Sequence, residues 1–243
     1  MDCLQRKFQV RHHEAGVDGT MRLAPLFDMF QDAAAEHAQI LGCGMDYLQE
    51  QGKAWVLSRI AVEITRMPAI GETVTVETYP TGVERLFALR QFTVMDGQGS
   101  VIARATSCWL LLDAAALRPL RIFETLGREL PQNEDKPRHF PVPARVAALP
   151  EKVTELSYTV RHSQIDVNRH LNNAFFASFV QDMTGALTGE HKMPATLQIL
   201  FQHAALPGEE IICRGGLENG TEFRMEGRSP DGATVYFQAQ GTL

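Results

Sequence analysis

The segment Tyr158–Leu171 reads YTVRHSQIDVNRHL and repeats an earlier segment, Phe8–Met21, which reads FQVRHHEAGVDGTM. The second copy follows the first at a constant offset of 150 residues, from position 8 to position 158, with no gap. Identical residues recur at this offset beyond both segments, which indicates that the chain contains one structural unit twice. The recurring residues are Val10, Arg11, His12, Val17, Ala24, Gln31 and Asp32, which return as Val160, Arg161, His162, Val167, Ala174, Gln181 and Asp182.

Each copy combines one helical segment with several strand-like segments. Apolar residues recur at helical spacing after both segments, which predicts a helix in each copy, with Asn172 or Asn173 capping the second. Strand patterns follow at 55–64, 73–78, 196–201 and 211–214, with hairpin turns at 96–97 and 231–232. This order predicts α+β domains in which one long helix packs on an antiparallel sheet. The apolar helix positions are Leu23, Leu26, Phe27, Met29 and Phe30, then Phe175, Phe176, Phe179, Val180, Met183 and Leu187.

Between the copies, residues 131–143 are rich in proline and charge, which is typical of a linker. We therefore expect an N-terminal domain over residues 1–130, a linker over 131–150 and a C-terminal domain over 151–243. His139 is expected to be solvated within the linker. Two joined copies would pair their sheets as an intrachain pseudo-dimer, which replaces the homodimer that a single copy would need.

Composition limits the possible functions. The 243 residues, 44% hydrophobic and 21% charged, match a soluble globular protein with one large or two small domains. The net charge of −6 disfavours nucleic-acid binding, which requires a basic surface. No apolar run approaches the roughly 18–20 residues of a membrane span, and the N-terminus lacks a signal peptide's apolar core. The four cysteines share no metal-site spacing, so we expect free thiols, no metal and a cytoplasmic location.

The second copy alone carries a reactive cluster. Asp166, Asn168 and His170 occupy alternate positions, so on an extended backbone their side chains would point to one face. A helix follows directly, and unpaired N–H groups at a helix start can stabilise an oxyanion. Such residues also cluster in turns for local reasons. The first copy has Gly16, Asp18 and Thr20 instead, which favours one working site and one degenerate site.

Motifs along nearly the whole chain resemble the acyl-acyl-carrier-protein thioesterases, a family with two tandem hotdog domains. The resemblance implies hydrolysis of a fatty-acyl thioester on acyl carrier protein, without a cofactor. It also implies a catalytic second domain and an acyl-chain pocket largely in the first domain. The segments that carry the resemblance are 166–173, Trp55–Arg59, Pro68–Glu72, Ala105–Trp109 with Asp113, and Arg118-Pro119.

By position, the resemblance implies that Asp166 is the general base or nucleophile, that Asn168 polarises the carbonyl, and that His170 orients or assists. Direct water attack and an anhydride intermediate both remain open. Many family members carry Glu, or Glu-Cys, where this chain aligns Ala204-Ala205. Three explanations remain open: the family's Glu is dispensable, Gln202 or His203 substitutes for it, or the activity is weakened. An acyl-CoA thioesterase and a non-catalytic acyl-binding hotdog protein are the alternatives.

The partner that the resemblance implies, acyl carrier protein, is strongly acidic. Basic side chains gather around the expected linker of this otherwise acidic chain, so they are either a solvated connection or a docking surface for the carrier. Whether the chain also forms a homodimer stays open. The basic residues are Arg118, Arg121, Arg128, Lys136, Arg138 and Arg145.

Overall fold

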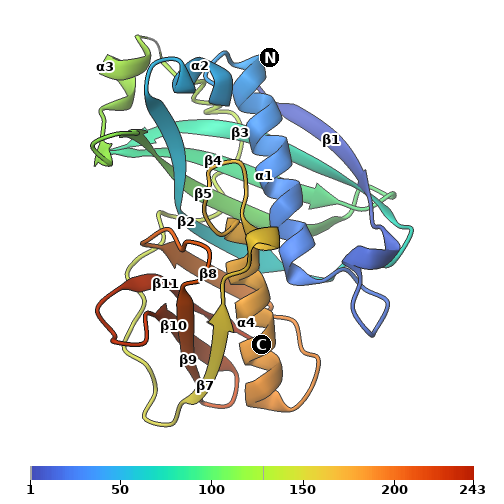
Figure 1. Ribbon diagram of the computed structural model, residues 1–243. Coiled ribbons are helices and arrows are strands. Elements are labelled where there is room, and N and C mark those ends of the chain that lie inside the picture. Colours follow the sequence, from blue (N-terminus) through green and yellow to red (C-terminus); the bar gives the residue numbers. More distant parts are fainter. Residues whose placement is uncertain (1, 128) are drawn as a thin grey trace. The chain divides into compact units, whose positions relative to one another are not determined.

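The computed structural model describes residues 2–127 and 129–243. The chain forms two compact units, which are described separately. The first comprises Met1–Met21 and Asp28–Val142, and the second comprises Arg22–Phe27 and Pro143–Leu243. Figure 1 shows a long helix against an antiparallel sheet in each unit, as the sequence predicts.

In the first unit, the sheet order is β1-β3-β4-β5-β2, with the short β6 paired to β5. Neighbouring strands pair antiparallel, and α1 lies across the sheet (Figure 1). The predicted strands at 55–64 and 73–78 lie within β2 and β3. The elements are β1 (Leu4–Gln9), η1 (His12–Glu14), α1 (Leu23–Ile40), α2 (Met45–Gln49), β2 (Lys53–Ile64), β3 (Thr73–Glu84), β4 (Phe87–Met95), β5 (Val101–Asp113), β6 (Arg118–Pro119) and α3 (Ile122–Leu126).

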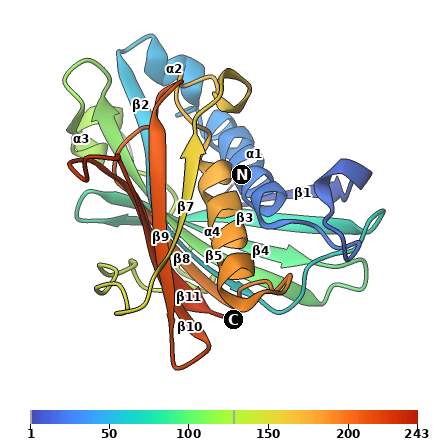
Figure 2. The same ribbon diagram turned by 60° about the horizontal axis from the view of Figure 1, so that its bottom comes forward.

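In the second unit, the sheet order is β7-β9-β10-β11-β8, and all pairs are again antiparallel. Figure 2 shows α4, in orange, running beside β7 and β9. The side chain of Asn172 caps α4 by accepting the Ala174 N–H at 2.9 Å, which confirms one of the two predicted caps. The elements are β7 (Thr154–Thr159), η2 (His162–Gln164), α4 (Asn173–Thr188), β8 (Thr196–Phe201), β9 (Glu210–Glu218), β10 (Glu222–Arg228) and β11 (Val235–Thr242).

The five-stranded paths of the two units have the same order of strands. In each unit, the strand that comes first in sequence lies at one edge and pairs with the third. The strand that comes second lies at the other end of the five-stranded path. Matching backbone bonds hold the end of the first strand in both units, so the sequence repeat marks a structural repeat. These bonds are Val10 N to Glu72 O and Val160 N to Glu209 O, both 2.9 Å, and Gly71 N to Val10 O and Gly208 N to Val160 O, both 2.9 Å.

Each helix buries its apolar face against its own sheet. In the first unit, the Phe30 ring of α1 lies 4.8 Å from the Phe92 ring of β4, and both side chains are buried. In the second unit, Phe176 of α4 lies 4.9 Å from Phe237 of β11. His37, near the end of α1, is fully buried and bonded to Arg90, so its imidazole is part of the core and has a polar partner.

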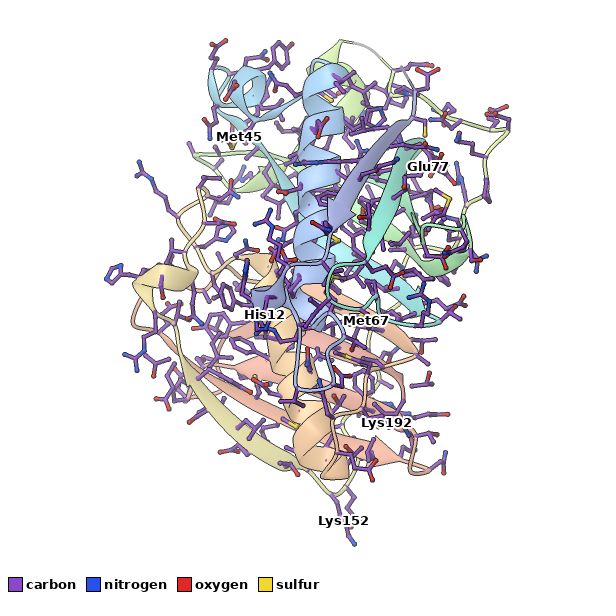
Figure 3. All side chains as sticks on the ribbon, turned by 90° about the vertical axis from the view of Figure 1, so that its right-hand side faces the viewer. His12, Met45, Met67, Glu77, Lys152 and Lys192 are labelled. Carbon is purple, nitrogen blue, oxygen red and sulfur yellow. The ribbon has the colours of Figure 1, made fainter. Side chains whose placement is uncertain are left out.

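The segment expected to be a solvated linker instead lies along the sheet of the first unit. Lys136 Nζ lies 3.0 Å from the carboxylate of Glu77, which Figure 3 labels on β3. Tyr79 Oη donates to Pro137 O at 2.8 Å. The expectation for His139 is wrong, because its ring bonds Thr93 Oγ1 at 3.1 Å and burial lowers the pKa of the imidazole. Prolines keep such a segment extended, but they do not stop its polar groups from bonding the sheet.

Arg66 joins the turn before β3 to the turn after β4. Its Nη2 donates to Glu72 Oε1 at 2.7 Å and to Asp96 Oδ2 at 2.9 Å. The hydrogen bond from Arg66, together with the Ala69 N–H and against the effect of burial, lowers the pKa of Glu72. A carboxyl whose pKa is lowered in the folded state stabilises the fold above its unfolded pKa, and this contribution disappears as the pH falls through the folded pKa.

We therefore expect Arg66→Met to flatten the dependence of the unfolding free energy on pH between about pH 5 and pH 3, the range in which Glu carboxyls titrate. Denaturant titrations at several pH values in this range measure the effect. Arg104→Met serves as the control, since Arg104 forms a half-exposed pair with Glu63 at 3.3 Å. Equal pH slopes for wild type and Arg66→Met would contradict the prediction.

Candidate active site

The predicted cluster lies on a tight turn between η2 and α4, not on an extended strand. A β-bridge joins Ile165 to Leu171, and the Asp166 N–H donates to His170 O at 3.0 Å. Arg169, at the turn's tip, has a left-handed φ of 67°. The expectation of an extended backbone is therefore wrong. The reason is local: Asp166 Oδ1 accepts the Asn168 N–H at 2.8 Å and folds the backbone into a turn.

The turn still brings the three side chains together. Asp166 Oδ2 lies 3.4 Å from Asn168 Nδ2, and Asp166 Oδ1 lies 4.0 Å from His170 Nδ1. The second distance is too long for a hydrogen bond but close enough for a carboxylate to stabilise an imidazolium. The side chains of Asp166 and His170 are 15% and 27% exposed, so both are partly sheltered and can be reached from solvent.

A backbone carbonyl fixes the tautomer of His170. Its Nδ1 lies 3.2 Å from Leu171 O, and a carbonyl oxygen can only accept, so Nδ1 carries the proton. Nε2 therefore has a lone pair. A neutral imidazole in this form can take a proton from water at Nε2 and pass it on, which is the chemistry of a general base.

The loop after β8 holds the end of the turn through its backbone. Leu171 N donates to Ala205 O at 2.8 Å, and Ala205 is fully buried, whereas Ala204 is exposed. Two polar side chains precede this pair on the same loop. Gln202 Nε2 donates to Gln238 Oε1 at 2.8 Å, and His203 Nδ1 donates to Val235 O at 2.8 Å. The alignment of Ala204-Ala205 with the family's Glu-Cys could not reveal this backbone role, because it depends on a carbonyl rather than on a side chain.

The first unit contains the same turn without the reactive groups. A bridge joins Ala15 to Met21, and Gly16 N donates to Thr20 O at 2.8 Å, as Asp166 N does to His170 O. Asp18 Oδ1 accepts the Thr20 N–H at 3.0 Å. The backbone shape therefore does not require Asp, Asn and His at positions 166, 168 and 170, which favours a functional reason for them.

Two further properties bear on the class of protein. No group of three or more His, Cys, Asp or Glu side chains that could hold a metal ion occurs within residues 2–127 and 129–243. In the same described part of the chain, none of the helices is both long and apolar enough to cross a membrane.

Two family profiles match most of the sequence. The acyl-ACP thioesterase N-terminal domain matches residues 2–130, and the acyl-ACP thioesterase C-terminal domain matches residues 147–238. The chain belongs to the acyl-ACP thioesterase family. The second profile includes the turn with Asp166, Asn168 and His170, so the candidate site lies inside the family's C-terminal domain.

Relatives of this thioesterase family member include curated plant proteins. A chloroplastic acyl-[acyl-carrier-protein] hydrolase of Cuphea viscosissima is 25% identical over 254 residues, which cover 95% of this chain and 60% of the relative. The chloroplastic oleoyl-acyl carrier protein thioesterase 2 of Arabidopsis thaliana is 27% identical over 72% of this chain and 52% of its own length. The chain thus spans between about half and 60% of the length of these relatives.

Among solved structures, an acyl-ACP thioesterase from Bacteroides thetaiotaomicron superposes with a TM-score of 0.88 at 23% identity, covering 99% of this chain and 97% of that one. This likeness confirms the predicted α+β hotdog fold in each half of the family member. The fold alone does not assign the chemistry, since hotdog domains serve several reactions.

Proposed function

We propose that this chain hydrolyses the thioester of fatty acyl-acyl-carrier-protein and releases the free fatty acid. The observation that carries the proposal is the cluster of Asp166, Asn168 and His170 on a turn whose counterpart in the first unit has Gly16, Asp18 and Thr20 at these positions. Membership of the family and the names of its plant relatives support this substrate class.

The geometry supports a scheme with His170 as the general base. His170 Nε2 takes a proton from water, and the water oxygen attacks the thioester carbonyl carbon. Asp166, 4.0 Å from Nδ1, stabilises the imidazolium, and an Asn168 Nδ2–H bonds the oxyanion. The proton then passes to sulfur as the C–S bond breaks, which gives a carboxylic acid and the carrier thiol.

In a second scheme, Asp166 attacks the carbonyl carbon itself, the thiol leaves, and water then cleaves the mixed anhydride. Rapid-quench mass spectrometry of the intact protein separates the two schemes. A protein that carries one acyl group during turnover supports attack by Asp166, and an unmodified protein throughout turnover supports water attack through His170.

We further propose that the second unit performs the reaction and that the first unit, without the reactive set, holds the acyl chain. For docking of the acidic carrier, the best-placed basic residues of those that the sequence suggests are Arg118, exposed on β6, and Arg145, exposed before β7. Arg121 instead bonds Glu124 at 2.9 Å, and Lys136 bonds Glu77 at 3.0 Å. Arg128 lies outside the described residues. A cytoplasmic location agrees with Cys108 and Cys213, which are buried thiols.

Steady-state hydrolysis tests the proposed function. We expect purified protein to release thiol from acyl carrier protein loaded with medium or long acyl chains, with a larger kcat/KM than for the acyl-CoA of equal length. A preference for acyl-CoA would contradict the proposed carrier. Stable acyl binding in native mass spectrometry without turnover would contradict the proposed enzyme.

A further inference from the structure

Arg90 is a buried cation without a carboxylate partner. Arg90 lies on β4, opposite Pro80 of β3 and Ser107 of β5, and only 8% of its surface is exposed. No carboxylate of residues 2–127 and 129–243 forms an ion pair with it. Burying an unpaired charge is unfavourable, so a position of this kind requires a reason. Other arginines of the chain do pair with acids, namely Arg6, Arg66, Arg104, Arg121 and Arg228.

One nitrogen of Arg90 is fully used. Nη1 donates to His37 Nδ1 at 3.0 Å and to Thr78 Oγ1 at 3.2 Å. Thr78 Oγ1 donates its own proton to Gln91 O at 2.9 Å, so it can only accept from Arg90. His37 Nδ1 must likewise accept, which places the His37 proton on Nε2. His37 and Thr78 therefore hold the guanidinium by one corner and fix its plane.

The other edge of the guanidinium remains open. Nε and Nη2 carry three N–H donors, and none of them has an acceptor within residues 2–127 and 129–243. The adjacent Gln91, which points to the opposite face of β4, provides a contrast. Its Nε2 donates to Thr81 Oγ1, and its Oε1 accepts from Thr106 Oγ1 and from the His139 N–H. The protein thus matches the polar groups of Gln91 with its own atoms but leaves one edge of Arg90 unmatched.

The shape of this edge and its surroundings define the ligand. Nε–H and Nη2–H lie side by side and match the two oxygens of a carboxylate. The neighbours on the same face of β4, Ala88 and Phe92, are buried, and the Phe92 ring lies 4.8 Å from the Phe30 ring of α1. A ligand that reaches Arg90 must therefore join a carboxylate to an apolar stem.

We propose that the Nε/Nη2 edge of Arg90 binds the carboxylate at the far end of an aliphatic acyl chain. Such a group occurs in a dicarboxylic acid and in an acyl thioester whose chain ends in a second carboxylate. The thioester form rests on the proposed function, whereas binding of the free diacid does not. Burial lowers the pKa of Arg90 to about 10, so the guanidinium stays charged near neutral pH and attracts the anion.

Calorimetric binding of a free diacid and a monoacid of equal chain length tests the site without turnover. We expect wild type to prefer the diacid, and Arg90→Met to shift the ratio of the two Kd values toward the monoacid by on the order of a hundredfold, as the loss of one partner of a buried ion pair predicts. Arg90→Lys keeps the charge but loses the two-pronged edge, so an intermediate ratio is expected. Arg104→Met, whose cation is half exposed, should leave the ratio unchanged.

An apolar residue of similar length can replace a buried charge without unfolding the chain, and Arg90→Lys provides a second folded variant if Arg90→Met fails to fold. The same ratio in wild type, Arg90→Met and Arg90→Lys would overturn the site, and so would a wild-type preference for the monoacid. Hydrolysis provides the second arm. An Arg90-dependent diacid preference in a protein that cleaves no thioester supports the site and refutes the proposed function. Turnover of simple acyl thioesters without an Arg90-dependent preference refutes the site alone.

Discussion

Replacing His170 by alanine is expected to lower kcat for acyl-thioester hydrolysis by about 10²–10⁴-fold, the range for loss of a positioned general base. The reason is the tautomer that Leu171 O imposes: Nε2 has the only lone pair of the ring, and alanine offers none. The unfolding free energy should change by less than about 1 kcal/mol, because the His170 side chain is partly exposed and the turn is closed by backbone bonds. Steady-state rates on acyl carrier protein, with denaturant unfolding in parallel, measure both effects.

The first unit provides the matched control for this substitution. Thr20 occupies the position equivalent to His170, on a turn with the same backbone bonds. Thr20→Ala removes a side chain that bonds Asp18 at 2.9 Å, so it perturbs a turn without touching the reactive groups. We expect its kcat to stay within about twofold of wild type, in keeping with the small effects of surface changes. A His170→Ala protein that is folded and as active as Thr20→Ala would exclude His170 from the reaction.

The sequence predicted which side chains of the candidate site lie together, but not the backbone conformation that brings them together. Asp166, Asn168 and His170 do gather, as their spacing suggested, but a turn rather than a strand gathers them. Two local preferences of the backbone compete in the segment from Asp166 to His170. Alternation favours an extended strand, whereas an aspartate two residues before an amide N–H favours a turn. The alternation of polar groups alone could not reveal which would win, because the closing contact to Ala205 comes from a loop more than thirty residues away.

In contrast, the internal sequence repeat allowed most of the fold to be predicted. A gap-free match over two segments implies equal local structure, and matching bonds at Val10 and Val160 confirm it. Elements found in only one copy, such as α2 and α3, had no such guide. The expectation that the segment after α3 is a solvated linker was wrong, because this segment also has no counterpart in the repeat. Its prolines indicate an extended chain, but only its partners Glu77, Tyr79 and Thr93 show that the extended chain lies on a sheet.

Arg90 could not be recognised from the sequence, since an arginine in an alternating strand is normally on the solvated face. The burial of Arg90 follows from its position in β4, where alternate side chains point to the same face. Phe92, two residues on, packs on Phe30, so Arg90 must share the same inward face. His37, fully buried on α1, accepts a hydrogen bond from Arg90 at 3.0 Å. Arg90 and His37 thus form a polar pair in the interior of the first unit.

Phe237→Ala is expected to lower the unfolding free energy by about 3–5 kcal/mol, the usual cost of removing a buried phenylalanine ring. Phe237 is fully buried on β11, and its ring lies 4.9 Å from Phe176 and 6.3 Å from Phe179. Alanine would leave a cavity between the sheet and α4, the helix that starts directly after the turn with Asp166, Asn168 and His170. Denaturant unfolding measures the loss. Phe123→Ala on α3 is the control, since Phe123 is 41% exposed and should cost less than about 1 kcal/mol.

A second substitution separates lost packing from other causes. Gly227 faces Phe237 across β10 and β11, and a methyl group on it would collide with the Phe237 ring. Gly227→Ala alone should therefore cost about 1–3 kcal/mol through overpacking. In the double variant the new methyl group enters the cavity that Phe237→Ala creates, so the combined loss should fall short of the sum of the single losses by about 1 kcal/mol or more. Strictly additive losses would show that the two residues do not share one packed space, and the ring of Phe237 would then not be what fixes α4 to its sheet.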